Sequence, residues 1–421
     1  MTTMIRIALC VLLALISSHA IAASSSNSAQ ELFERYRDSI IQVQITNKLS
    51  GERSALGTGF YVSNDGLVVT NYHVVSLVVQ KPDNYRVEII HRDGSKEKPD
   101  IVNFDIINDL ALLRTETKPV NPFSLAIEPL RKGARILSLG NPNDLGMTLV
   151  NGSYSGNLEN SLYERIHFSG TINQGMSGGP AIDEYGKVIG INVATSGNGV
   201  GFLVPAKFGV QLIDKTRHDQ KAEGVMENIQ KQLWLNQERF MGTLLTGEIP
   251  VSPLGEYMLP DRIAPFMHCW GDSDKDKKDM YEVVTRVCSS RQDVFIDEDY
   301  STGQIFYRHK YIKSGQLNAL RFSSLYEATL SDRLPTDGDE EYHTNFRCND
   351  DFVDNGSVNM KISLCLRGHK KVHGLFDMTL VAVSLQKNNS GMQTSLLLTG
   401  VSYENAQKFA RKYLKAISWK Q

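Results

Sequence analysis

Hydrophobic and polar residues alternate in short runs through the first half of the chain. Apolar side chains stand at every second position from residue 41 to 45, which is the period of a half-buried β-strand, and residues 57–62 repeat the pattern. The sequence Asn-Asp-Gly at 64–66 is typical of a hairpin turn, and the apolar residues 67–70 follow as the returning strand. Strands and turns continue at this density to about residue 208, so the pattern predicts a mainly β region.

A different pattern begins after residue 210. Residues 222–246 have apolar side chains at helical spacing and predict an amphipathic helix. Its candidate buried positions are Met226, Ile229, Leu233, Leu235, Phe240 and Leu244. We expect a helical linker over residues 215–246, which either packs on the preceding strands or joins two domains.

Strand patterns return from about residue 251. They are predicted at 293–296, 304–311, 317–322, 358–365, 376–385 and 394–401. A closing helix follows Ser402, which is a favourable N-cap residue. We therefore expect a separate α+β C-terminal domain over residues 251–421, and we find no catalytic motif in it.

Length and charge narrow the class of protein. A chain of 421 residues with a formal net charge of −2 suits a soluble globular protein of about two domains and gives no reason to expect a nucleic-acid partner. Residues 1–22 contain a basic residue, an apolar run and then small residues, which is the order of a secretory signal peptide. The apolar run is too short to span a bilayer. We expect an exported protein, periplasmic or secreted, with no membrane anchor.

The cysteines also indicate an exported protein. Cys10 would be removed with the signal peptide, which leaves an even number of cysteines, as two disulfides require. Three pairings are open, and the pairing of sequence neighbours closes the shortest loops: Cys269 with Cys288, and Cys348 with Cys365. Buried free thiols are the alternative.

A serine between glycines is the main candidate for chemistry. Residues 175–180 read Gly-Met-Ser-Gly-Gly-Pro. Glycine allows the N–H groups of Gly175 and Ser177 to converge on one point, where they can bind the oxyanion that forms when the Ser177 hydroxyl attacks a carbonyl. The spacing also fits the nucleophile elbow of α/β-hydrolases, but a helix follows that elbow, and here two short strands follow. The acid and the base should therefore lie upstream.

Two upstream residues complete a candidate triad. His73 follows the predicted strand 67–70, and Asp109 stands at the head of an apolar strand. The chain order His73, Asp109, Ser177 is that of the chymotrypsin clan. In such a site the histidine takes the serine proton, and the aspartate orients the imidazole and stabilises its charged form. This chemistry needs no metal and no cofactor.

These motifs together resemble a trypsin-like serine protease of the HtrA (DegP) kind. They lie at 58–60 (TGF), 70–75 (TNYHVV), 108–113 (NDLALL), 175–180 (GMSGGP) and 199–205 (GVGFLVP). The resemblance covers residues 35–210 and implies His73 as general base, Asp109 as its orienting acid and Ser177 as nucleophile. It also implies the oxyanion hole of Gly175 and Ser177.

The same resemblance implies a chymotrypsin-like fold. Two antiparallel six-stranded β-barrels are expected at about 38–118 and 130–208, with the triad in the cleft between them. HtrA proteases normally continue into PDZ domains, and no PDZ domain is recognisable in the rest of this sequence.

The primary specificity pocket can be read in part from spacing. Thr171 stands six residues before the nucleophile, where trypsin-type enzymes place an aspartate, and Asn192 stands where glutamyl endopeptidases place a histidine. Because neither residue can pair with a charged side chain, the pocket is expected to favour a small or medium apolar residue before the cut bond. Val193 and Gly201 are the candidate wall residues.

These observations lead to three candidate functions. The first is an exported serine endopeptidase that cleaves polypeptide substrates through an acyl-enzyme on Ser177. A non-proteolytic chaperone or adaptor on a protease scaffold is the second. The third is a protease held latent by its C-terminal domain, which is also the candidate surface for a protein partner.

Overall fold

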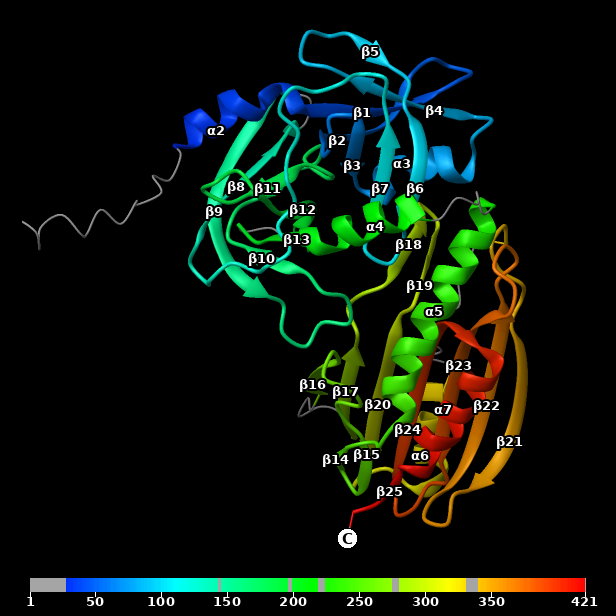
Figure 1. Ribbon diagram of the computed structural model, residues 1–421. Coiled ribbons are helices and arrows are strands. Elements are labelled where there is room, and N and C mark those ends of the chain that lie inside the picture. Colours follow the sequence, from blue (N-terminus) through cyan, green and yellow to red (C-terminus); the bar gives the residue numbers. More distant parts are fainter. Residues whose placement is uncertain are drawn as a thin grey trace, which may run out of the picture.

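The chain builds two β-rich regions that are joined by one long helix (Figure 1). A computed structural model describes residues 28–142, 145–195, 199–218, 224–274, 280–330 and 340–420. The expected signal peptide lies outside these residues. Within the described ranges, none of the helices combines the length and the apolar character that crossing a membrane requires. We call residues 28–218 the N-terminal region and residues 251–420 the C-terminal region.

The first half of the N-terminal region is an antiparallel sheet in the order β5-β4-β1-β2-β3-β7-β6. Its strands are β1 (Ile40–Asn47), β2 (Arg53–Tyr61), β3 (Leu67–Thr70), β4 (Tyr85–Ile90), β5 (Lys96–Glu97), β6 (Asp100–Asp105) and β7 (Leu110–Arg114). The expected hairpin is present, with Phe60 of β2 opposite Val69 of β3. A closed six-stranded barrel was expected here, but the sheet has seven strands and two open edges. The additional strand is β5, whose two residues pair only with β4.

The second half of the N-terminal region is a closed barrel of six strands in the order β10-β13-β12-β11-β8-β9. These are β8 (Arg135–Gly140), β9 (Thr148–Asn157), β10 (Ile166–Phe168), β11 (Pro180–Ile182), β12 (Val188–Thr195) and β13 (Gly201–Pro205). Apolar side chains such as Ile136, Phe168 and Leu203 are buried inside it. Helical segments in the described part of the two halves are α2 (Ala29–Tyr36), η1 (Arg37–Ser39), α3 (Tyr72–Gln80) and α4 (Ala206–His218).

Within the residues expected to form the linker helix, the structure has α5 (Val225–Leu245). Ile229, Leu233, Phe240 and Leu244 are buried as expected. Leu235 was expected to be buried but is 63 % exposed. Because consecutive residues are about 100° apart around a helix, Leu235 lies nearly opposite Leu233 and faces solvent.

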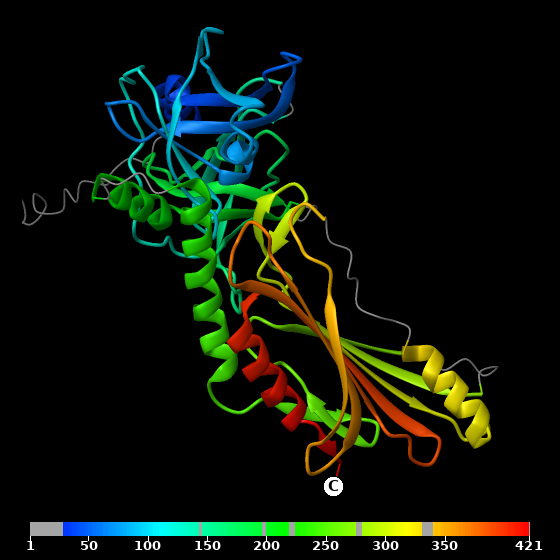
Figure 2. The ribbon, with the colours of Figure 1, turned by 90° about the vertical axis from the view of Figure 1, so that its right-hand side faces the viewer.

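The C-terminal region is built on an antiparallel sheet in the order β16-β17-β20-β24-β23-β22-β21. Its strands are β16 (His268–Asp274), β17 (Glu282–Ser289), β20 (Ile305–Lys313), β21 (Arg347–Asp354), β22 (Asn359–Gly368), β23 (Leu375–Ser384) and β24 (Ser390–Ser402). Helices α5 and α7 (Tyr403–Lys415) lie side by side against this sheet (Figures 1 and 2). Ser402 caps α7 as predicted, because its hydroxyl accepts the N–H of Asn405.

One predicted strand of this region was wrong. Residues 317–322 were expected to be extended, but α6 (Ala319–Leu330) begins there. Phe322 and Tyr326 are four residues apart and both are buried, next to Ile312 and Val383. A helix places residues 322 and 326 on the same face, so both rings can pack in this cluster.

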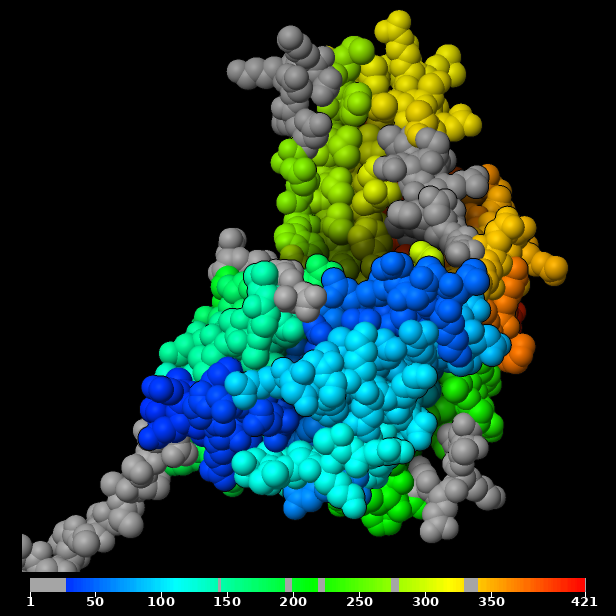
Figure 3. Space-filling view, turned by 90° about the horizontal axis from the view of Figure 1, so that it is seen from above, coloured from blue at the N-terminus to red at the C-terminus, as the bar shows by residue number. Residues whose placement is uncertain are grey.

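Two smaller sheets complete the fold. The first contains β14 (Val251–Leu254), β15 (Tyr257–Pro260) and β25 (Ser418–Trp419). The second is a hairpin of β18 (Val294–Asp297) and β19 (Tyr300–Thr302). Seen from above, the C-terminal region extends well past the N-terminal region (Figure 3).

Two disulfides hold the edges of the C-terminal sheet. Cys269 of β16 is bonded to Cys288 of β17, directly opposite in the strand register. Cys348 of β21 is bonded to Cys365 of β22 in the same way. These are the pairings between sequence neighbours, and each ties an edge strand to the strand beside it.

A single hydrophobic cluster connects the two regions. It contains Ile41 of β1, Val75 of α3, Phe240 of α5 and Leu380 of the C-terminal sheet. At the contact between the regions the Tyr72 hydroxyl of α3 donates to the Ile296 carbonyl of β18 at 3.0 Å. The hairpin of the C-terminal region is therefore anchored on the helix that carries His73.

Candidate active site

Neighbouring strands bring His73 and Asp109 together. His73 is the second residue of α3, which follows β3, and Asp109 immediately precedes β7. These two strands pair with Thr70 opposite Ala111. His73 Nδ1 lies 2.7 Å from Asp109 Oδ2, and the His73 backbone N–H donates to Asp109 Oδ1 at 2.8 Å. The carboxylate thus fixes both the backbone and the ring of the histidine.

Asp109 itself has an unusual backbone. Its φ of 61° is in the left-handed region, which is uncommon for a residue with a side chain. The Asn71 side-chain amide donates to the Asp109 carbonyl at 2.8 Å and holds the turn. Such a conformation persists only where the surroundings enforce it, and it is found more often at functional sites.

The Asp109 carboxylate also controls the charge of His73. Burial disfavours the charged ring and lowers the pKa of His73, but the Asp109 charge and its hydrogen bond outweigh burial. The pKa of His73 therefore lies above its ordinary value of 6.5.

The loop before β11 presents Ser177. Gly175 and Gly178 have φ values of 92° and 84°, and a Cβ on Gly178 would lie 2.2 Å from the Thr58 carbonyl oxygen. Thr58 ties this loop to β2, because its N–H donates to the Ser177 carbonyl at 2.8 Å and its hydroxyl to the Gly175 carbonyl at 2.6 Å. Among the described residues, the N–H groups of Gly175 and Ser177 have no acceptor. Both groups are therefore available to an oxyanion.

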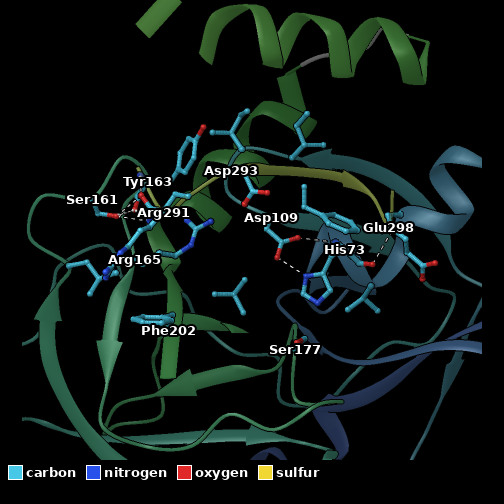
Figure 4. A pocket seen from close by; sticks show the side chains of 18 of the residues that line it. His73, Asp109, Ser161, Tyr163, Arg165, Ser177, Phe202, Arg291, Asp293 and Glu298 are labelled. Carbon is cyan, nitrogen blue, oxygen red and sulfur yellow. Dashed lines mark hydrogen bonds and ion pairs between the residues drawn. The ribbon is translucent and has the colours of Figure 1, made fainter. Parts of the chain in front are cut away.

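Ser177 and His73 face the same cavity (Figure 4). Within the part of the chain that the structure describes, the Ser177 hydroxyl makes no hydrogen bond to the His73 ring. Such a bond is often long before substrate binds and shortens in the complex. The arrangement places a hydroxyl, an imidazole and a carboxylate at one wall of a cavity of about 1080 Å³.

The C-terminal region supplies part of this cavity, which the sequence did not indicate. Its lining residues there include His268, Arg291, Gln292, Asp293, Phe295 and Glu298. The Phe295 ring lies edge-on to the His73 ring, with 6.3 Å between centroids. These residues carry no motif. They reach the cavity because the C-terminal region packs against α3 and against residues 161–163, so no sequence signal could have found them.

Gln292 fastens this wall to the N-terminal region. Its side-chain oxygen accepts the N–H groups of Leu162 at 2.7 Å and Tyr163 at 3.2 Å, and its amide donates to the Ser161 hydroxyl at 2.8 Å. The loop between β9 and β10 is thus held against the segment that precedes β18.

The four residues expected in the specificity pocket lie in different places. Val193 lines the cavity, whereas Thr171 is exposed and is not among its lining residues. Gly201 lies on β13, where a Cβ would be 2.7 Å from the Gly170 carbonyl oxygen. Arg165 and Phe202, which the sequence did not single out, line the cavity instead.

Asn192 is completely buried and supports the Ser177 loop. Its side-chain oxygen accepts the Ser138 hydroxyl at 2.8 Å, and its amide donates to the Leu139 carbonyl at 3.1 Å and the Met176 carbonyl at 3.2 Å. With these three partners the side chain holds β8 and the serine loop together, and it does not reach the cavity.

The N-terminal region contains a match to a known family. The family described as trypsin-like peptidase domain matches residues 57–191. A probable periplasmic serine endoprotease, DegP-like, of Chlamydia muridarum is 33% identical over 216 residues, which cover 47% of this chain and 42% of that protein. Serine protease HTRA1 of Xenopus tropicalis is 30% identical over 194 residues, which cover 43% of this chain and 41% of that protein.

A solved structure, the serine endoprotease from Yersinia pestis, is similar at 24% identity with a TM-score of 0.40, covering 47% of this chain and 70% of that chain. The present chain spans about two fifths of the length of the two curated relatives.

Proposed function

We propose that this chain, which matches a trypsin-like peptidase domain over residues 57–191 and resembles HtrA serine proteases, cleaves polypeptides through an acyl-enzyme on Ser177. The observation that carries this proposal is the 2.7 Å contact between His73 Nδ1 and Asp109 Oδ2 at the wall of the cavity that also holds Ser177. A hydroxyl beside an oriented imidazole is the arrangement that acyl transfer requires.

The proposed reaction follows from these contacts. Asp109 holds Nδ1 of His73, which leaves Nε2 to accept the proton as Ser177 Oγ attacks the substrate carbonyl. The N–H groups of Gly175 and Ser177 stabilise the oxyanion. His73 then gives the proton to the leaving amine, and the acyl-enzyme forms. Water attacks the ester in the second half of the reaction, with His73 again as the base.

We propose that the C-terminal region limits which polypeptides reach Ser177. Phe295 and Gln292 line the cavity beside the catalytic residues, so a substrate chain must fit between the two regions. This arrangement favours a protease whose C-terminal region selects or restricts substrates over a chaperone that only retains the protease scaffold.

Export is part of the proposal. Residues 1–22 have the order of a secretory signal, and the relative from Chlamydia muridarum is named as periplasmic. We propose a periplasmic or secreted location. Polypeptides are then the proposed substrates, and the C-terminal region is the proposed surface for a protein partner.

Casein cleavage by purified protein tests the endopeptidase proposal. Ser177→Ala should lower the rate by several powers of ten, because it removes the nucleophile and leaves the fold in place. Ser124→Ala is a matched control, because Ser124 is exposed and its side chain lies outside the cavity. Cleavage by Ser177→Ala at the normal rate, with the control also active, would show that Ser177 is not the nucleophile.

A further inference from the structure

Arg165 is a cation in the cavity whose function the proposed reaction does not explain. It precedes β10 and lines the same cavity as His73 and Ser177. One guanidinium N–H donates to the carbonyl of the neighbouring Glu164 at 3.0 Å. Across the described ranges, no carboxylate oxygen lies within 4.0 Å of the Arg165 guanidinium.

The acids near Arg165 are engaged elsewhere. The Glu164 carboxylate accepts Lys207 Nζ at 2.7 Å and the Asn157 side-chain amide at 2.9 Å. Glu159, which also lines the cavity, lies 3.7 Å from Lys132 Nζ. Asp109 is bound to His73. The local structure therefore provides carboxylates close by but directs none of them to Arg165.

Burial imposes a desolvation cost on the charged Arg165 guanidinium. Desolvation lowers the pKa of Arg165, and the charges of Asp109 and Asp105 act against that from a distance. Its side chain is only partly exposed, and it lies on the wall of the cavity. A guanidinium in this position gains most from a carboxylate that enters the cavity with a ligand, because charge-assisted bonds are stronger where water is scarce.

The remaining charged groups of the cavity come from the C-terminal region. Arg291 stacks on Trp270, with 3.9 Å from its guanidinium carbon to the ring centroid. Asp293 and Glu298 also line the cavity, but neither is within ion-pair distance of Arg165 in the described structure. Val193 and Phe202 add apolar lining, which excludes water from part of the cavity.

We propose that Arg165 binds an acidic side chain, Asp or Glu, of the polypeptide substrate near the cut bond. The inference rests on the proposed endopeptidase function and adds a substrate class to it. The expected apolar preference depended on Thr171 and Asn192, and neither of these lines the cavity. Of the two arginines that line this cavity, Arg291 is stacked on Trp270, so Arg165 is the arginine to which we assign recognition of substrate charge.

Cleavage mapping of denatured proteins by mass spectrometry provides the first measurement. With wild-type protein, Asp and Glu should be enriched at one fixed position relative to the cut bond. Two peptides that differ only in Glu or Gln at that position should then differ about 10- to 100-fold in kcat/KM, as expected for a hydrogen-bonded ion pair.

Variants assign this preference to Arg165. In Arg165→Ala the Glu/Gln ratio should fall to about one, and Arg165→Lys should recover part of it. Arg131→Ala is the matched control, because Arg131 is exposed and does not line the cavity. The wild-type ratio does not depend on any variant folding.

The outcomes separate the two proposals. If wild-type protein cleaves but the Glu/Gln ratio is near one at every position, the role of Arg165 is overturned and the endopeptidase stands. If the Glu/Gln ratio is high and stays high in a folded Arg165→Ala, another group binds the acidic side chain. The role of Arg165 is then also overturned. If the protein neither cleaves peptides nor reacts with an active-serine phosphonate, both proposals fail.

Discussion

At the scale of single residues, His73 sets the pH dependence of the proposed activity. Asp109 raises the pKa of His73 above 6.5 despite burial. A general base must be neutral, so the rate should fall as the pH drops through this raised pKa. The acid limb of kcat/KM, measured from about pH 5 to 9 on a peptide, should have its midpoint above pH 6.5. A midpoint below that value would mean that burial, and not Asp109, has the larger effect on the pKa of His73.

Single residues also show which parts of the candidate site could be predicted from the sequence. The motif spacing predicted His73, Asp109 and Ser177 as one site, and the structure places all three at one cavity. The polar residue Asn192 looked like a pocket residue in the sequence, yet its amide and oxygen are satisfied inside the barrel. Arg165 carries no motif, and its importance depends on which carboxylates surround it in three dimensions.

At the scale of elements, the segment before β18 controls the wall of the cavity. Replacing Gln292 by Ala removes the acceptor for the N–H groups of Leu162 and Tyr163. The free energy of unfolding should fall by about 1–3 kcal/mol, because buried N–H donors lose their acceptor. Amide hydrogen exchange at these two residues should also become faster.

The control for this prediction is Gln316→Ala, an exposed glutamine of the same region. Chemical denaturation and hydrogen exchange of both variants make the comparison. Equal exchange at residues 162 and 163 in the two variants would contradict the proposed fastening of the wall by Gln292.

Hydrophobic periodicity predicted helices and strands better than it predicted what they pack against. The helix at α5 was clear from its apolar spacing, although Leu235 was placed on the wrong face. Residues 317–322 looked extended because the window ended before Tyr326, which completes a helical pair with Phe322. The strand at 293–296 was predicted, but its position against α3 depends on long-range contacts that a local pattern does not contain.

At the scale of the whole molecule, the two regions are less separate than the sequence suggested. One hydrophobic cluster runs from the first sheet through α5 into the C-terminal sheet. The cavity with Ser177 is closed in part by the C-terminal region, so substrate entry and the packing of the two regions are coupled. Removing the C-terminal region would expose this cluster, which makes point variants better tests than truncation.

The central claim is that Ser177 is the nucleophile of a working triad. Wild-type protein treated with an active-serine phosphonate, digested and analysed by mass spectrometry tests it most directly. We predict a single adduct on Ser177, with a labelling rate that falls by orders of magnitude in His73→Ala because the serine loses its base. An adduct on another serine, or no adduct on a protein that still cleaves casein, would contradict the proposed mechanism.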